Sequence, residues 1–158
     1  MADIETARAG SDDLGELVPL FAGYLRFYRR PVDEARIAAF LRERLAGGES
    51  VVFLARHGAA AVGFVQLYPS FASLSLARSW ILNDLFVQPQ ARGLGAGRAL
   101  MLAARQLGQD TGAAELFLQT AGDNTTAQTL YEDLGWVRDD AYLVYTLDPR
   151  REATGAGE

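Results

Sequence analysis

The apolar and polar positions along the chain change between a two-residue and a 3.6-residue period, which predicts a mixed α/β protein. Weak alternation from Ile4 to Arg8 predicts a short first strand. Apolar residues at helical spacing run from Leu14 to Tyr28, after an N-cap with acidic neighbours at Ser11-Asp12-Asp13. Pro19 lies inside this helical pattern, and we expect it to kink or divide the helix because it lacks an N–H donor.

The next part of the chain predicts a second helix and then two strands. The helix begins at Asp33 and stops at Gly47-Gly48, because glycine favours a helix end. Two apolar runs, residues 50–56 and 60–68, predict a hairpin. Residues 69–77 are rich in serine and small side chains, and we expect a surface loop there.

The run from Ser79 to Val87 is apolar on both alternating faces, which is typical of a central strand that is covered on both sides. Asn83 and Asp84 interrupt this run. A buried carboxylate is costly unless it is paired or opens onto a wet cleft. Asp84 therefore has either a structural role, such as pairing with an arginine, or a functional one.

The last third of the chain alternates helices and strands. The pattern predicts a helix after the glycines at 93–97, a strand from Glu115 to Gln119, and a helix that Gly135 closes. A last strand is predicted from Ala141 to Leu147, with room for a short strand at 136–138 before it. No linker or repeat interrupts residues 1–148, so we expect one domain with a mixed sheet and helices on both faces, followed by a disordered tail at 149–158.

Composition excludes several classes of function. The chain has 158 residues, a net charge of −5, no cysteine and one histidine. Disulfides, cysteine-bound zinc and histidine metal clusters are therefore excluded, and the charge argues against a general nucleic-acid binder. No apolar run is long enough to span a bilayer, and the first residues do not resemble a signal peptide. We expect a cytoplasmic protein with no metal and no membrane or nucleic-acid partner.

Three glycines, at 93, 95 and 97, stand between a strand that ends at Val87 and a helix, which is the pattern of an anion-binding loop. The loop is not a P-loop, because no lysine follows the glycines. It does not match a dinucleotide fingerprint either, since Arg98 or Leu100 falls where the third glycine should stand.

The spacing Gln90-x-x-Gly93-x-Gly95 after Leu-Phe-Val-x-Pro resembles the acetyl-CoA pyrophosphate loop of the GNAT N-acetyltransferase superfamily. Residues 124–136, Asn-x-x-Ala-x-x-Leu-Tyr-Glu-x-Leu-Gly-Trp, resemble the second signature of that superfamily. Residues 63–68 and 82–87 are most similar to the branch of the yeast histone/polyamine and spermidine/spermine acetyltransferases. The resemblance implies a GNAT fold, with a splayed, mostly antiparallel sheet of six to seven strands.

The resemblance also implies acetyl-CoA as the co-substrate, wedged between the strand that ends at Val87 and the strand at 115–119. Backbone groups of Leu85 and Val87 would pair with the pantetheine arm, and amides from Arg92 to Gly97 would hold the pyrophosphate. The residues implied at the cofactor are Leu85, Phe86, Val87, Arg92, Gly93, Leu94, Gly95, Ala96, Gly97, Arg98, Asn124, Ala127 and Tyr131.

The implied reaction is direct acetyl transfer to a primary amine of a small molecule, either an amino-acid-like metabolite or a polyamine. In similar families the tyrosine at the position of Tyr131 protonates the leaving thiolate, although an aromatic at this spacing is also compatible with core packing. Asp84 is the candidate base or water organiser, provided that a bulge turns it from the direction that a regular strand would give it. Asn83 stands where polyamine enzymes carry a glutamate, and is a candidate acceptor ligand.

The acceptor pocket is expected from the first helix and the loop before the central strand. Its residues are Tyr24, Phe27, Tyr28, Tyr68, Trp80 and Asn83. Arginines at 26, 29 and 30 favour an acceptor with its own carboxylate or phosphate, unless they only cap the helix. Two other functions stay open, namely acetylation of protein lysines or N-termini and a non-catalytic acyl-CoA sensor, and the resemblance makes a homodimer plausible.

Overall fold

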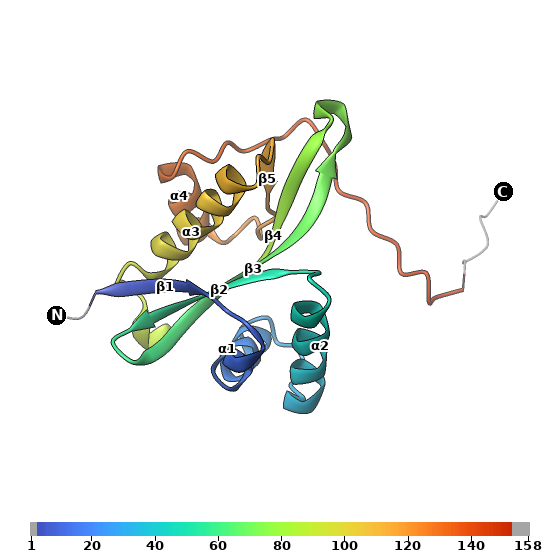
Figure 1. The fold of residues 1–158 in the computed structure, drawn as a ribbon. Coiled ribbons are helices and arrows are strands. Elements are labelled where there is room, and N and C mark those ends of the chain that lie inside the picture. The colour runs from blue at the N-terminus through green and yellow to red at the C-terminus, as the bar shows by residue number, and fades with distance from the viewer. Residues whose placement is uncertain (1–2, 153–158) are drawn as a thin grey trace. The chain divides into compact units, whose positions relative to one another are not determined.

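A five-stranded mixed sheet organises residues 3–119 in the computed structural model, which describes residues 3–152 as two units, 3–119 and 120–152. The strands lie in chain order: β1 (Ile4–Arg8), β2 (Val51–His57), β3 (Ala60–Ala72), β4 (Ala77–Val87) and β5 (Glu115–Phe117) (Figure 1). Neighbours are antiparallel, except that β5 is parallel to β4. The mixed α/β sheet is confirmed, but the expected six to seven strands are wrong, because the sheet has five.

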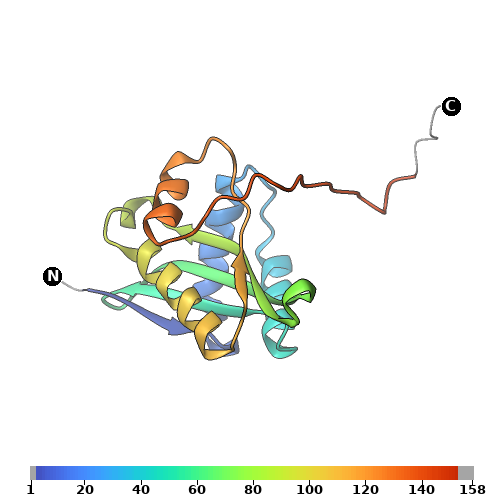
Figure 2. The same ribbon diagram turned by 90° about the horizontal axis from the view of Figure 1, so that it is seen from above.

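Helices cover both faces of this sheet. α1 (Leu14–Phe27) and α2 (Glu34–Ala46) lie on one face and α3 (Ala96–Asp110) on the other (Figures 1 and 2). The core on the α1 and α2 side buries Ala9, Leu17, Leu20, Ala22, Ile37, Leu41, Val52, Leu54, Phe64 and Phe86. Within residues 3–152, no helix is long and apolar enough to cross a membrane.

Helix boundaries follow the local signals closely. The Asp33 carboxylate accepts a hydrogen bond from the Arg36 backbone N–H at 3.2 Å and so caps α2, which ends at Ala46 with Gly47 as its C-cap. Pro19 does not divide α1, which runs unbroken through it. The lost backbone hydrogen bond is offset by burial of Leu17 and Leu20 on either side of the proline.

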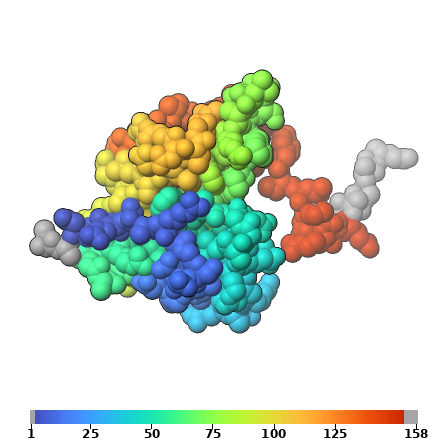
Figure 3. Space-filling view, in the orientation of Figure 1, coloured from blue at the N-terminus to red at the C-terminus, as the bar shows by residue number. Residues whose placement is uncertain are grey.

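The β3–β4 hairpin is longer than the sequence predicts. The surface loop expected at 69–77 is wrong: β3 continues to Ala72, a 3-10 turn spans Ser73–Ser75, and β4 begins at Ala77. Pro69 is tolerated because the ladder with β2 ends at Leu67, so the missing N–H breaks no central pairing. The tip of the hairpin, in light green, projects from the surface in Figure 3.

The second unit contains α4 (Thr125–Asp133), and Gly135 follows it with a φ of 90°. The strands predicted at 136–138 and 141–147 are wrong, since this described segment contains no strand. Residues 141–147 have the alternating apolar pattern of a strand, but a strand also needs a neighbouring strand to pair with its backbone N–H and C=O groups. β5 likewise ends at Phe117 rather than Gln119. Of the predicted tail at 149–158, residues 153–158 lie outside the described residues.

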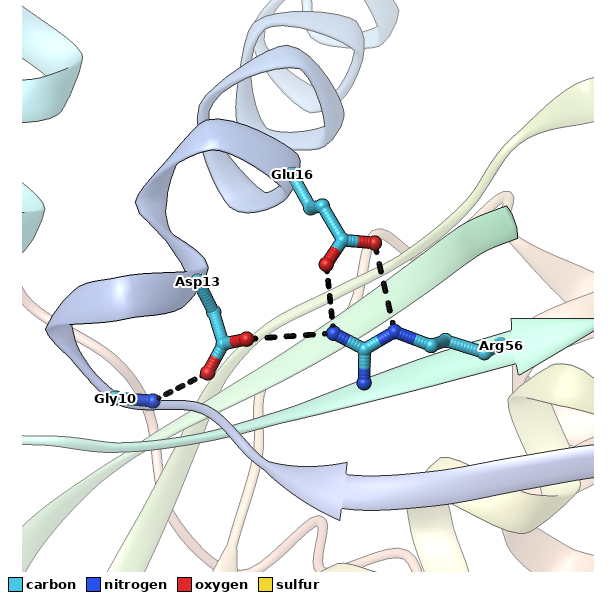
Figure 4. Close-up of polar contacts among 4 residues, drawn as sticks. All are labelled: Gly10, Asp13, Glu16 and Arg56. Atoms are coloured by element: carbon cyan, nitrogen blue, oxygen red, sulfur yellow. Dashed lines mark hydrogen bonds and ion pairs between the residues drawn. The ribbon is translucent and has the colours of Figure 1, made fainter. Parts of the chain in front are cut away.

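An ion-pair cluster fastens the start of α1 to β2 (Figure 4). Arg56 donates to both carboxylate oxygens of Glu16, at 2.8 and 3.4 Å, and to Asp13 at 3.3 Å. The other oxygen of Asp13 accepts from the Gly10 backbone N–H at 2.8 Å. The hydrogen bond to Glu16, with the charges of both carboxylates, raises the pKa of Arg56. The cluster therefore holds the N-terminus of α1 against the sheet.

Arg56→Met should lower the free energy of unfolding by about 1–2 kcal/mol, because it removes the charged hydrogen bonds and keeps the apolar stem. Since all three side chains are partly exposed, the loss should be smaller in high salt. Urea unfolding at low and high salt measures both effects. Arg138→Met is the matched control, because its ion pair with Asp140 is largely exposed and should contribute little. Equal losses in the two variants would contradict this account.

Candidate functional site

The second half of β4 has an open edge. The ladder with β5 ends where Ile81 pairs with Phe117, whereas the ladder with β3 continues to Val87. Residues 82–87 thus pair on one side only, among the residues that the structure describes. Gln88 donates its backbone N–H to β3, to the Val62 carbonyl at 2.8 Å. Because alternate residues of a strand direct their backbone groups to the same side, those of Leu85 and Val87 face the open edge.

The loop after β4 presents a group of unpaired amides. A 3-10 turn at Pro89–Ala91 leads into Gly93 and Gly95, whose φ values are 80° and 87°, and Gly95 is the N-cap of α3. The first bond of the helix runs from the Ala99 N–H to the Gly95 carbonyl at 3.0 Å. The N–H groups of residues 93–98 donate to no acceptor in the described part of the chain. Free N–H donors at the positive end of a helix are suited to binding an anion.

Two exposed arginines flank these amides. Arg92 donates from Nε to the Val87 carbonyl at 3.3 Å, and its guanidinium lies 5.6 Å from the ring centre of Phe27. Arg92 therefore sits where the open edge meets the loop. Arg98 is exposed in the first turn of α3. Leu94 is exposed at the loop surface, while Ala96 is buried under it.

A β-bulge decides the direction of Asp84. Gln66 pairs with Asp84 and Leu67 pairs with Leu82, so Asn83 is an extra residue without a partner in β3. The sequence predicts a catalytic role for Asp84 only if a β-bulge redirects its side chain, and the structure contains this bulge. Asp84 consequently shares the face of Phe86, under α1, whereas Trp80 and Leu82 belong to the other face.

Two amides hold the Asp84 carboxylate. Gln66 donates from Nε2 to Oδ2 at 2.9 Å, and Asn83 donates from Nδ2 to Oδ1 at 3.1 Å. Asp84 is only 6% exposed, and no basic side chain of residues 3–152 forms an ion pair with it. The same residues contain no cluster of three or more metal-ligating side chains. The pairing with an arginine that the sequence left open is thus not observed.

Gln66 is the residue of this site that sequence reasoning missed. It is fully buried, and its Oε1 has no hydrogen-bond partner in the described structure. A signal was present, because Gln66 is the one polar side chain in the apolar run from Val62 to Leu67. A polar group inside a buried strand needs an explanation in the same way as Asp84 did.

Tyr68 follows two residues further along the same face of β3 and is half-buried. Burial, and next the negative charge of Asp84, raises the pKa of Tyr68 to about 12, while Arg44 on α2 acts in the opposite direction. The Tyr68 hydroxyl therefore keeps its proton throughout the neutral range. It lies at the more exposed end of the polar group that Gln66 and Asp84 form.

Alkaline titration should show one tyrosine of the folded protein with a pKa of about 12. Because the pKa of Tyr68 in the folded protein lies above its ordinary value of 10.0, the stability linked to Tyr68 is complete below pH 10.0 and is lost as pH rises through about 12. Tyrosinate absorbance measures the transition, which Tyr68→Phe should remove and the exposed-site control Tyr142→Phe should not. Asp84→Asn should lower the pKa of Tyr68, and an unchanged value would show that the charge of Asp84 does not raise it.

The aromatic residues expected at the acceptor are only partly brought together. Tyr24 packs against Phe64 and Phe86 at ring distances of 5.7 and 6.2 Å. Tyr28 stands 5.1 Å from Tyr24, and Phe27 and Tyr28 are about half exposed at the end of α1. Trp80 is not part of this group, because the bulge places it on the opposite face.

Trp80 donates from Nε1 to the Thr111 hydroxyl at 2.8 Å, at the end of α3.

Arginines 26, 29 and 30 are exposed and form no ion pair within the described chain. The backbone closes this end of α1, since the N–H of Arg30 bonds to the Leu25 carbonyl at 2.9 Å. The side chains of Arg26, Arg29 and Arg30 therefore do not cap α1.

The second unit holds the remaining predicted residues. Asn124 accepts a hydrogen bond from the Ala127 N–H at 3.3 Å and caps α4. Tyr131 lies on α4 with its ring 6.2 Å from that of Trp136. The segment thus forms a capped helix that presents Asn124 at its N-terminus and a partly buried Tyr131 in its last turn.

Comparison with known proteins identifies the relatives of this chain. The model of the acetyltransferase (GNAT) family matches residues 17–136. An uncharacterized N-acetyltransferase of Bacillus subtilis, YhfO, is 43% identical over 141 residues, which are 89% of this chain and 95% of that protein.

Solved structures agree with this relationship. The crystal structure of a probable acetyltransferase is 38% identical with a TM-score of 0.87, covering 94% of this chain and 99% of that one. The aminoglycoside N-acetyltransferase AAC(6')-Iy in complex with CoA has a TM-score of 0.78 at 19% identity, with 93% and 96% covered, which shows a shared fold.

Proposed function

Because the chain belongs to the acetyltransferase (GNAT) family, we propose that it transfers the acetyl group of acetyl-CoA directly to a primary amine of a small molecule. The observation that carries the proposal is the open edge of β4 at Leu85 and Val87, which continues into the unpaired amides of residues 93–98. A ligand with an extended arm followed by a pyrophosphate matches this arrangement, because the arm can lie along the open edge and the pyrophosphate can meet the amides.

These residues fit coenzyme A on physical grounds. The amides and the helix N-terminus favour the pyrophosphate, and Arg92 and Arg98 are near enough in the chain to add positive charge. The backbone groups of Leu85 and Val87 can pair with the amides of the pantetheine arm in the manner of an added strand. When bound, the cofactor supplies a thioester whose carbonyl carbon an amine can attack. Asn124 and Ala127 are proposed as further contacts to the cofactor.

Asp84 is proposed as the base of the reaction. An aliphatic amine has a pKa near that of lysine, about 10.4, so the acceptor arrives as an ammonium ion and must lose a proton before it attacks. The Asp84 carboxylate has two amide donors and no cationic partner among the described residues, so it is able to receive that proton. Asn83, which holds the other oxygen of Asp84, is the proposed contact to the acceptor.

Tyr131 is proposed as the acid. After the amine nitrogen forms its bond to the carbonyl carbon and the carbon–sulfur bond breaks, the thiolate takes the phenolic proton of Tyr131. The nitrogen releases its second proton to solvent, Tyr131 takes a proton back from solvent, and Asp84 releases to solvent the proton that it received. The sum is one N-acetyl product, one free thiol and one proton released from each ammonium ion.

The acceptor is proposed to bind beside α1, near Tyr24, Phe27, Tyr28 and Tyr68. The exposed arginines at the end of α1 favour an amine that also carries a carboxylate or a phosphate over a polyamine. The likeness to the yeast histone/polyamine branch stays a prediction, as does a homodimer. Trp80 is withdrawn from this group because it bonds to Thr111.

The test is an assay of CoA release with acetyl-CoA and a panel of amines. The panel should contain amino acids, phosphorylated amines, polyamines, an aminoglycoside and a lysine peptide. We expect turnover on a small primary amine, with acidic acceptors preferred to polyamines. Measurable acetyl-CoA binding without turnover on any amine would contradict an enzyme and favour a sensor, and turnover on the peptide alone would favour protein acetylation.

A further inference from the structure

A buried amide and a buried carboxylate form a pair across β3 and β4. Gln66 has no exposed surface and Asp84 is 6% exposed, and the Gln66 Nε2 to Asp84 Oδ2 distance is 2.9 Å. The bulge at Asn83 is what sets these two residues directly opposite each other. The pair is therefore built by the register of the sheet and not by neighbours in the chain.

The pair costs stability as it stands. Gln66 Oε1 is buried without a hydrogen bond, and a buried acceptor that has lost water and gained no donor is unfavourable. An apolar side chain of similar size would remove this cost and would fit the apolar run around it. The arrangement is thus explained better by what the amide does for Asp84 than by packing.

The groups that face the pair leave Asp84 without a counter-ion. Tyr68 of β3 carries a neutral hydroxyl, and Tyr24 of α1 packs on the rings that flank the pair. Arg44 of α2 is already paired with Glu43 at 3.0 Å and Glu49 at 3.4 Å. A carboxylate in such surroundings attracts a cation of small size.

We propose that Gln66 is a positioning residue that orients the Asp84 carboxylate, and that the pair is a recognition site for the ammonium group of the acceptor. The inference rests on the proposed function and narrows its substrate to aliphatic amines, which are cations at neutral pH. Arylamines and other weakly basic amines, which are neutral at that pH, are disfavoured. Asp84 contacts the ammonium ion, and Gln66 acts through Asp84.

The test follows the Asp84 carboxyl carbon by NMR in protein labelled at aspartate, with Asp84→Asn to identify the signal. Gln66→Met keeps the side-chain volume and removes the donor, so the Asp84 carboxyl signal should move from its wild-type position. Titration with n-butylammonium should shift the wild-type signal to saturation, whereas n-butanol should not. Affinity for the ammonium ion should fall by about tenfold in Gln66→Met, as expected when a buried charge loses one hydrogen bond.

Gln106→Met is the matched control. Gln106 donates to Asp110 at 2.8 Å as Gln66 does to Asp84, but this pair is exposed on α3, so its loss should leave Asp84 unchanged. An unmoved Asp84 carboxyl signal in Gln66→Met, or equal shifts with n-butanol and n-butylammonium, would overturn the proposal. If Gln66→Met does not fold, Gln66→Glu replaces it.

In Gln66→Glu a second carboxyl replaces the amide donor, so the Asp84 carboxyl signal should again move from its wild-type position, whereas an unmoved signal would overturn the proposal. None of these measurements needs turnover. A protein that passes them without acetylating any amine would refute the proposed function and leave the ammonium site standing. If the protein acetylates an amine but the Asp84 signal does not respond to substitution of Gln66, the proposed function stands and the ammonium site is refuted.

Discussion

Tyr131→Phe is expected to lower kcat by about 10²–10³-fold and to leave the affinity for acetyl-CoA unchanged. The substitution removes one oxygen atom and with it the proton that the leaving thiolate would take. The ring is kept, so its packing against Trp136 in the second unit is preserved. Steady-state kinetics with a responsive amine, together with calorimetric titration of CoA, separate the chemical step from binding.

Tyr145→Phe is the control for this variant, because Tyr145 is 88% exposed and belongs to no proposed site. It should retain wild-type kcat. A Tyr131→Phe enzyme with full activity would show that Tyr131 only packs on its helix. A loss of CoA affinity equal to the loss of rate would instead assign Tyr131 to cofactor binding.

Gly95→Ala is expected to weaken acetyl-CoA binding by about tenfold or more, which corresponds to about 1.4 kcal/mol. Gly95 has a φ of 87° and no neighbouring atom within 4 Å of the position where a Cβ would stand. A methyl group there is strained by the backbone and adds bulk within the stretch of unpaired amides. Calorimetric titration of CoA measures the affinity, and urea unfolding measures stability.

Gly112→Ala separates these two effects. Gly112 follows the other end of α3, has a φ of 66° and also has open space around it. Both variants should lose about 1–2 kcal/mol of stability from the left-handed backbone, but only Gly95→Ala should lose affinity. Equal affinities in the two variants would mean that the amides of this loop do not hold the pyrophosphate.

Much of the site could be predicted because its signals are local. Glycine spacing, the strand before it and the helix after it specify the loop at 93–97 without reference to distant residues, and Asp33 and Asn124 predict their helix starts in the same way. Residues 141–147 show the limit of such signals. Their alternation is typical of a strand, but pairing depends on a partner elsewhere in the chain.

By itself, the sequence determined the glycine turn before α3, the order of helices and strands in residues 3–119, and the family, since each depends on residues close together in the chain. The tertiary structure alone decided which way Asp84 points, that Gln66 is its partner and that Trp80 belongs to the other face. The physical reason is the two-residue period of a strand. One extra residue at Asn83 reverses every side chain beyond it, and only the cross-strand register shows where that residue is placed.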